Sequence, residues 1–171
     1  ISHVKNGIYG EMWVAAMIAV AAYTDDVEEI IRGGLAEIPS SSRLYESIVS
    51  IIDCYKTGVS QNDCFAMIHS RWNEHTFHGW CHTISNAMIV AASLLYGEGD
   101  FSKSICMAVE TGFDTDCNGA TVGSILGMAN GENSIPSCWK EPINDTLHTS
   151  IFGVGTVKIS DCVEKTFKHL I

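Results

Sequence analysis

Apolar residues recur at helical spacing through most of the chain, and few segments alternate in the way strands do. The pattern predicts helices over residues 11–23, 27–36, 43–56, 60–72, 83–96 and 101–111, and another beyond Asn118. Residues 1–10, with glycines at positions 7 and 10, are expected to form a loop. A short strand is expected at 153–159, and a closing amphipathic helix over 161–171. The fold class is therefore expected to be all-α.

Polar residues mark the starts of several predicted helices. Thr24, Asp25 and Asp26 stand directly before residues 27–36, where acidic groups favour a helix N-terminus. We interpret these three residues as a helix cap. The serines at 40–42 follow Pro39 and can cap the next helix in the same way.

The stretch from Gly112 to Gly131 carries the strongest chemical signal. Asp114 and Asp116 stand two residues apart, and Asn118 follows at once. Two carboxylates at a crowded turn repel each other, while carboxylate oxygens are ligands that Mg²⁺ or Ca²⁺ prefers. Small residues then recur every four positions: Gly119, Gly123 and Gly127. This spacing predicts a hard-cation site at the start of a buried central helix, with one face bare enough for another helix to approach closely.

The aspartates have two other possible interpretations. Residues 114–119 fit the opening of an EF-hand loop, but the twelfth position of that loop must be Glu and here it is Ile125. The EF-hand interpretation therefore fails. The other is that Asp114 and Asp116 only cap the helix and bind no ion. Local chemistry alone leaves metal binding and simple capping equally open.

The motif Gly112-x-Asp-Thr-Asp-x-Asn, running into a Gly/Ala-rich helix that ends at Gly131, resembles the C-terminal metal motif of the ADP-ribosylglycohydrolase family. The segments 86–101 and 7–18 resemble other parts of that family's domain, and the similarity spans roughly residues 1–140. The resemblance implies an orthogonal multi-helix assembly. Residues 1–171 would form the C-terminal part of a single ADP-ribosylglycohydrolase-like domain.

The resemblance also implies a chemistry, the Mg²⁺-dependent hydrolysis of an ADP-ribosyl bond. Two Mg²⁺ ions, with Mn²⁺ as an alternative, would be held in part by four residues: Asp114, Asp116, Cys117 and Asn118. Much of the family has Thr where Cys117 stands, and a thiol is a poor ligand for Mg²⁺. Catalytic residues are expected upstream, so a companion polypeptide carrying the N-terminal half is expected. A non-catalytic ADP-ribose-binding or structural relative, or a hydrolase of another ribosyl N-glycoside, remains open.

A second group of residues is expected to bind the substrate. His3 and the segment from Asn6 to Gly10 resemble the part of the family's domain that lies against ADP-ribose. Amides of Gly7 and Gly10 would approach a diphosphate closely there, while an ordinary helix start is an equal alternative. Tyr9 is a candidate for stacking on adenine, although an aromatic residue is more often part of the core.

Residues 73–82 are rich in polar and aromatic groups, as in a site loop. His82, with Thr83 and Asn86, is expected at the cleft, although a local hydrogen bond is the simpler role for His82. Three histidines suggest zinc by count: His75, His78 and His82. Their spacing demands a continuous helix that Gly79 interrupts, so zinc is not expected. Two tryptophans are further stacking candidates, Trp80 and Trp139.

Composition narrows the classes of function. A length of 171 residues with 46% hydrophobic content favours one domain with a core, and the net charge of −10 argues against a nucleic-acid partner. A phosphate-bearing ligand would need help from a metal or backbone amides. The apolar runs 12–22 and 87–95 fall short of the ~20 residues that cross a bilayer, so no membrane partner is expected. Seven scattered cysteines without a C-x-x-C pair fit reduced thiols in the cytoplasm.

Overall fold

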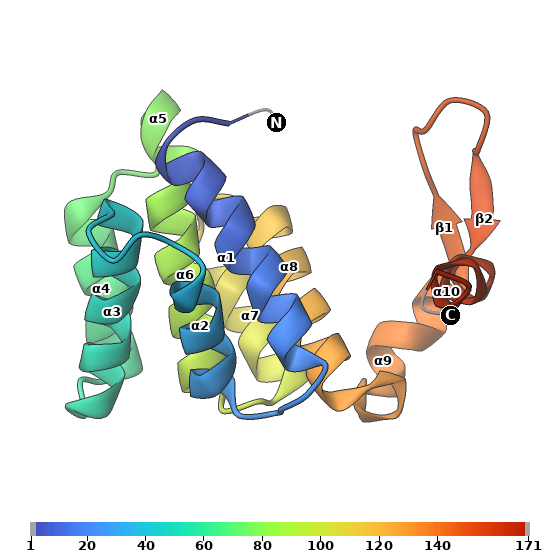
Figure 1. Cartoon of the computed structure of the whole chain (residues 1–171), viewed down its shortest axis with the longest axis horizontal. Helices are drawn as coiled ribbons and strands as arrows, with labels where there is room; N and C mark the ends of the chain where they lie inside the picture. The colour runs from blue at the N-terminus through green and yellow to red at the C-terminus, as the bar shows by residue number, and fades with distance from the viewer. Residues whose placement is uncertain (1–2, 170–171) are drawn as a thin grey trace. The chain divides into compact units, whose positions relative to one another are not determined.

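The computed structural model describes residues 3–169, and the all-α class is confirmed (Figure 1). The α-helices are α1 (Asn6–Ala21), α2 (Val27–Ala36), α3 (Arg43–Lys56), α4 (Gln61–Arg71), α5 (Phe77–Trp80), α6 (Thr83–Gly97), α7 (Phe101–Glu110), α8 (Thr115–Asn130), α9 (Ser137–Lys140) and α10 (Ile159–Phe167). Two 3-10 turns, η1 (Glu132–Ser134) and η2 (Glu141–Ile143), flank α9. The chain divides into two compact units, Ile1–Ser134 and Ile135–Ile171.

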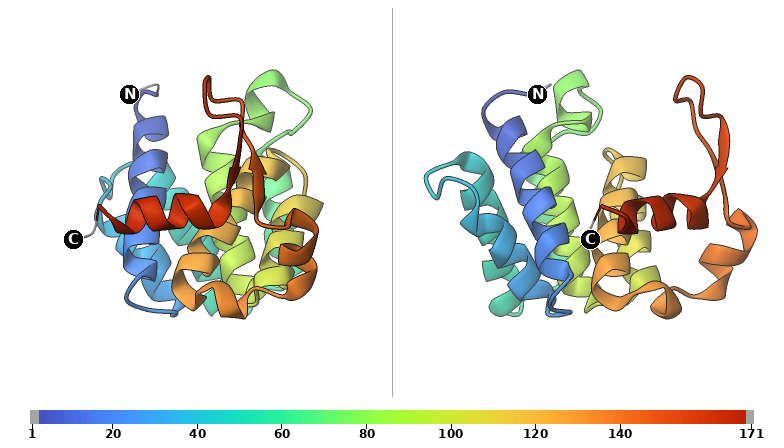
Figure 2. Two further views of the ribbon diagram at one scale, coloured as in Figure 1. Left: turned by 90° about the vertical axis from the view of Figure 1, so that its right-hand side faces the viewer. Right: turned by 45° about the vertical axis from the view of Figure 1, so that its right-hand side comes forward.

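Helix α6 is the centre of the first unit because its residues are small or apolar on all sides. Every residue from Ala87 to Leu95 is buried. The helix packs against α1, α2, α3, α4, α7 and α8, which surround it in the views of Figure 2. Helix α7 approaches the C-terminal end of α6 closely, since a Cβ atom on Gly97 would lie 1.8 Å from Ser104 Oγ. No helix within residues 3–169 combines the length and apolar character needed to cross a bilayer.

The central buried helix was expected to be α8, and this prediction is wrong. Only one face of α8 is buried, and Met128 on the other side remains 49% exposed. The expected close approach of a neighbouring helix is confirmed, because Gly119 and Gly123 face α7. A Cβ atom on Gly119 would lie 3.1 Å from Val109 Cγ2, and one on Gly123 would lie 3.3 Å from Ile105 Cδ1.

Helix α1 begins at Asn6, so the prediction of a loop over residues 1–10 is wrong from position 6 onward. Residues 1–2 of that range lie outside the described part of the chain. Glycine is required at helix positions 7 and 10 because the side chains of His3 and Thr83 occupy the space that a Cβ atom would take. A Cβ atom on Gly7 would lie 2.8 Å from His3 Cβ, and one on Gly10 would lie 2.5 Å from Thr83 Cγ2. Gly10 therefore marks close packing of α1 against the start of α6, and Gly7 marks close packing against His3.

Polar side chains cap the helices that follow α1. Asp26 Oδ1 accepts a hydrogen bond from the Glu29 N–H at 2.9 Å, which confirms the interpretation of residues 24–26 as a cap of α2. Ser42 Oγ accepts from the Tyr45 N–H at 3.2 Å and begins α3. Each cap satisfies an amide that the first helical turn cannot pair internally.

The second unit contains a β-hairpin and the amphipathic helix α10. Strands β1 (Thr146–His148) and β2 (Thr156–Lys158) are antiparallel, with Leu147 opposite Val157. The strand expected within 153–159 is thus confirmed, whereas β1 was not predicted. Helix α10 matches the expected closing helix but begins at Ile159, and residues 170–171 lie outside the described part of the chain. None of residues 135–169 is buried, so these residues provide no core of their own.

Candidate metal centre and adjoining groove

The turn between α7 and α8 determines where the two aspartates lie. Gly112 has φ +86° and Phe113 has φ +61°, so two successive residues adopt the left-handed conformation before the chain enters α8. Asp114 then occupies the N-cap position of α8, and Asp116 lies in its first turn. The Asp114 side chain accepts no capping hydrogen bond from the helix. Helix capping therefore does not explain why an aspartate stands at position 114.

Asp114 comes together with Asp116 and Cys117 on the outer side of this turn. One ligand atom from each of the three residues lies within 4.8 Å of the others. Asp114 is half-buried, while Asp116 and Cys117 are exposed. Within residues 3–169 no other group of three His, Cys, Asp or Glu side chains is arranged closely enough to hold an ion.

The carboxylates of Asp114 and Asp116 lie close enough to repel each other. Burial, followed by the hydrogen bond with Asp116 and its charge, raises the pKa of the Asp114 carboxyl above its ordinary value. Burial and the nearby charge of Asp114 raise the pKa of the Cys117 thiol. A divalent cation would remove the repulsion between the two carboxylates. The two carboxylates fit Mg²⁺ or Mn²⁺, whereas the Cys117 sulfur is a ligand that Mg²⁺ disfavours.

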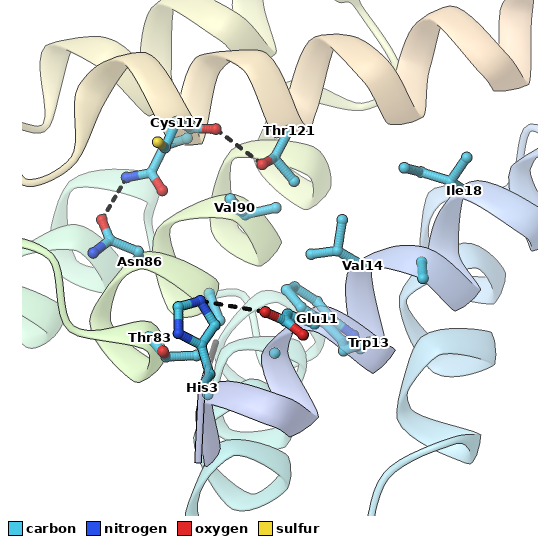
Figure 3. A pocket seen from close by; sticks show the side chains of 15 residues that line it. His3, Glu11, Trp13, Val14, Ile18, Thr83, Asn86, Val90, Cys117 and Thr121 are labelled. Carbon is cyan, nitrogen blue, oxygen red and sulfur yellow. Dashed lines mark hydrogen bonds and ion pairs between the residues drawn. The ribbon is translucent and has the colours of Figure 1, made fainter. Parts of the chain in front are cut away.

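An open groove runs from this cluster along α8, α6 and α1, with a volume of about 530 Å³ (Figure 3). Its floor is apolar: Trp13, Val14, Ile18, Ala87 and Val90. Polar groups lie on its sides, and Figure 3 shows Cys117 and Thr121 across the groove from His3 and Glu11. His3 Nε2 lies 3.3 Å from Glu11 Oε1. The groove therefore combines an apolar floor with polar sides next to the carboxylates.

Three of the predicted substrate-binding residues line this groove, namely His3, Gly7 and Gly10. The Gly7 N–H donates to the Val4 carbonyl at 3.0 Å, and Gly10 lies inside α1. Close packing accounts for both glycines, by His3 against Gly7 and by Thr83 of α6 against Gly10.

The other predicted substrate-binding residues make local contacts. Asn6 Oδ1 accepts from the Leu44 N–H at 3.2 Å, and Tyr9 packs against the core. His82 Nδ1 accepts from the Ile84 N–H at 3.2 Å and caps α6, which is the simpler role expected from the sequence.

A family model described as ADP-ribosylglycohydrolase matches residues 1–166. The chain belongs to the ADP-ribosylglycohydrolase family. No curated protein and no solved structure matches it. The ADP-ribosylglycohydrolases are glycosyl hydrolases, so membership supports an enzymatic role on ADP-ribose. The resemblance found in the sequence is therefore confirmed at the level of family and fold.

Two side chains from other parts of the first unit bind the turn between α7 and α8. Asn86 Oδ1 accepts from the Asp114 N–H at 3.2 Å and from Asn118 Nδ2 at 2.8 Å. Asn118, predicted as a metal ligand, is buried and its amide nitrogen is engaged in this way. Glu74 Oε2 accepts from the Phe113 N–H at 2.9 Å. Asn86 was expected at the cleft and Glu74 in a polar loop, but nothing in the sequence indicated that either binds the turn.

The remaining aromatic and histidine candidates are not members of the cluster. His75 and His78 are exposed, and they form no metal-binding group with His82 among the described residues. His82 instead stacks on Trp72, with ring centroids 4.5 Å apart. Trp80 is 51% exposed in the first unit, and Trp139 belongs to the second unit.

Proposed function

We propose that this chain serves an enzyme that hydrolyses an ADP-ribosyl bond with the help of Mg²⁺, releasing ADP-ribose from a modified side chain or small molecule. One observation carries the proposal: the ligand atoms of Asp114, Asp116 and Cys117 lie within 4.8 Å of one another at the start of α8, in a chain that matches the ADP-ribosylglycohydrolase model. Asp114 and Asp116 would ligate a cation, with Mn²⁺ as a substitute and a second ion held nearby.

The bound ions would supply Lewis-acid and templating chemistry at the ribose hydroxyls and the attacking water. The chain's own residues would position the substrate. ADP-ribose carries two phosphates, and the net charge of −10 would repel it without local compensation. The groove offers an apolar floor for a flat ring and polar sides at His3 and Thr83. The proposal therefore places ADP-ribose along the groove, with its ribose towards Asp114.

We propose that a companion segment completes the active site. Only three ligand atoms are grouped within residues 3–169, and these cannot surround two ions. Helix α1 and the residues before it also have an apolar outer side: Val4, which precedes the helix, is 76% exposed, and Ile8 and Met12 of the helix are each 40% exposed. A helix with apolar residues all round is normally buried. A segment carrying further carboxylates would cover this side and supply the residues that act on water.

The exposed cysteines support a reducing compartment, which we propose to be the cytoplasm. All seven cysteines are free, and five of them are exposed: Cys81, Cys106, Cys117, Cys138 and Cys162. Exposed thiols persist in reduced form where glutathione and thioredoxin keep them so.

The test is turnover of an ADP-ribosyl-arginine peptide by the complete protein with its companion segment, with released ADP-ribose measured by mass spectrometry. Mg²⁺-dependent release is expected. Asp114→Asn and Asp116→Asn should each lower it by at least about 100-fold, since even residues that only support a metal ligand cost 10- to 100-fold. Asp53→Asn, an exposed aspartate of α3, is the matched control and should change nothing.

The outcomes separate the proposal from its alternatives. Binding of ADP-ribose without any release indicates a non-catalytic relative, which the sulfur ligand of Cys117 favours. Release from a different ribosyl N-glycoside, but not from ADP-ribosyl-arginine, indicates another leaving group. Full activity in both aspartate variants contradicts the metal assignment. The 171 residues alone are expected to show no turnover, because the described residues supply only one side of the cage.

A further inference from the structure

A carboxylate from a distant part of the first unit reaches the turn that precedes the candidate metal centre. Glu74 lies between α4 and α5, and its Oε2 accepts from the Phe113 N–H at 2.9 Å, across 39 positions of sequence. The Glu74 side chain is 27% exposed, so solvent competes only partly for this hydrogen bond. The bond therefore joins two segments that no helix connects.

The turn needs such a constraint because its backbone is unfavourable. Phe113 is a bulky residue with φ +61°, a conformation that costs roughly 1–2 kcal/mol for a side chain with a Cβ atom. Its ring is buried and lies 5.1 Å from the ring of His69. The burial of the ring and the hydrogen bond to Glu74 together hold Phe113 in this conformation.

Gly112 is needed for the same arrangement. Its φ of +86° favours glycine, and a Cβ atom there would lie 2.1 Å from Glu74 Oε2. The first glycine of the motif thus makes room for the carboxylate that holds the next residue. His69 braces this carboxylate, because its Nδ1 lies 3.9 Å from Glu74 Oε1 and its Nε2 lies 3.2 Å from Thr111 Oγ1.

We propose that Glu74 is a positioning residue for the metal centre. Glu74 is not itself among the grouped ligand atoms. It fixes the Phe113 N–H, Asn86 fixes the Asp114 N–H, and the two acceptors direct Asp114 towards Asp116 and Cys117. This inference rests on the proposed cation binding, although the hydrogen bond from the Phe113 N–H to Glu74 does not need an ion.

The test compares two substitutions of Glu74 in the full chain by NMR. Glu74→Ala removes the acceptor, whereas Glu74→Gln keeps an oxygen that accepts the same N–H but removes the charge. Two readouts are taken: hydrogen exchange of the Phe113 amide without metal, and the Mn²⁺ concentration that broadens the Gly119 amide signal to half. Glu110→Ala, at the exposed end of α7, controls for loss of a nearby negative charge.

Glu74→Ala is expected to raise the Mn²⁺ requirement by about 10-fold or more, as for other partners that orient metal ligands, and to speed exchange of the Phe113 amide. Glu74→Gln and Glu110→Ala should stay near wild type in both readouts. Unchanged Phe113 exchange in Glu74→Ala would overturn the inference. So would equal weakening in the Gln and Ala variants, because charge and not the hydrogen bond would then be responsible.

The two proposals fail in different ways. If the wild-type chain shows no Mn²⁺ effect at Gly119, the proposed cation site is wrong, while Phe113 exchange still decides whether Glu74 holds the turn. If wild type binds Mn²⁺ and Glu74→Ala binds it equally well, cation binding stands and the role of Glu74 is wrong.

Discussion

His82 begins α6 through a ring nitrogen that must be unprotonated, because Nδ1 accepts the Ile84 N–H. Burial, with smaller contributions from the charges of Arg43 and His78, lowers the pKa of His82 below its ordinary value. The unfolded chain therefore binds the proton more readily than the folded chain. The cap's contribution is fully present above about pH 6.5 and is lost as pH falls towards the lowered value.

His82→Asn tests this dependence, because Asn caps helices well and does not titrate. Between pH 7.5 and pH 5.5, the free energy of unfolding is expected to fall less in His82→Asn than in wild type. Urea unfolding at several pH values measures the difference, with exposed His75→Asn as the control. Equal pH dependence in His82→Asn and wild type would show that His82 is not the responsible group.

Among the helices, α7 leads directly into the metal motif, so the position of the motif depends on how closely α7 packs against α6. Gly97 is a point of close approach, with Ser104 Oγ at 1.8 Å and the Ser104 backbone Cα at 3.1 Å from an added Cβ atom. Gly97→Ala is expected to destabilise the chain by about 1–3 kcal/mol, because the neighbouring helix must shift. Thermal unfolding measures the loss.

The matched control for this prediction is Gly119→Ala on the other side of α7. The nearest atom to its added Cβ is a side-chain methyl of Val109 at 3.1 Å, and Val109 is 43% exposed and free to move. Gly119→Ala should therefore change stability much less than Gly97→Ala. Equal losses of stability in the two variants would mean that α7 packs no more tightly against Gly97 of α6 than against Gly119 of α8.

Helix periodicity was enough to predict most of these elements, because amphipathic segments such as 27–36 and 43–56 bury one face in the usual way. The prediction of a loop at residues 6–10 failed because tertiary packing overrides the local signal there. Gly7 and Gly10 indicated a loop, but they lie in α1, where His3 packs closely on Gly7 and Thr83 of α6 packs closely on Gly10. The Asp-Thr-Asp motif gave the position of the cluster, whereas the hydrogen bond from Phe113 to Glu74 depends on a contact across the fold.

At the scale of the whole molecule, stability should reside in the first unit. The buried hydrophobic core runs from Trp13 to Leu126, and none of residues 135–169 is buried. A chain ending at Ser134 is therefore expected to fold with nearly unchanged helix packing and a midpoint of thermal unfolding within about 4 °C of the full chain, equivalent to roughly 1 kcal/mol.

Amide NMR spectra of the full and shortened chains check this expectation. Signals from α1 to α8 should superimpose in the two spectra. Loss of cooperative unfolding in the shortened chain would show that the second unit contributes to the core.

Titration of Mn²⁺ into the isotope-labelled full chain shows whether Asp114 and Asp116 hold a divalent cation. Broadening is expected first at residues 112–119 and should be reversed by Mg²⁺. Asp114→Asn should abolish this local broadening. It should not destabilise the metal-free chain, because the Asp114 carboxylate makes no capping hydrogen bond and its removal ends the repulsion with Asp116. Broadening that is scattered over the acidic surface, or that is unchanged in Asp114→Asn, would show that Asp114 and Asp116 do not form a specific cation site.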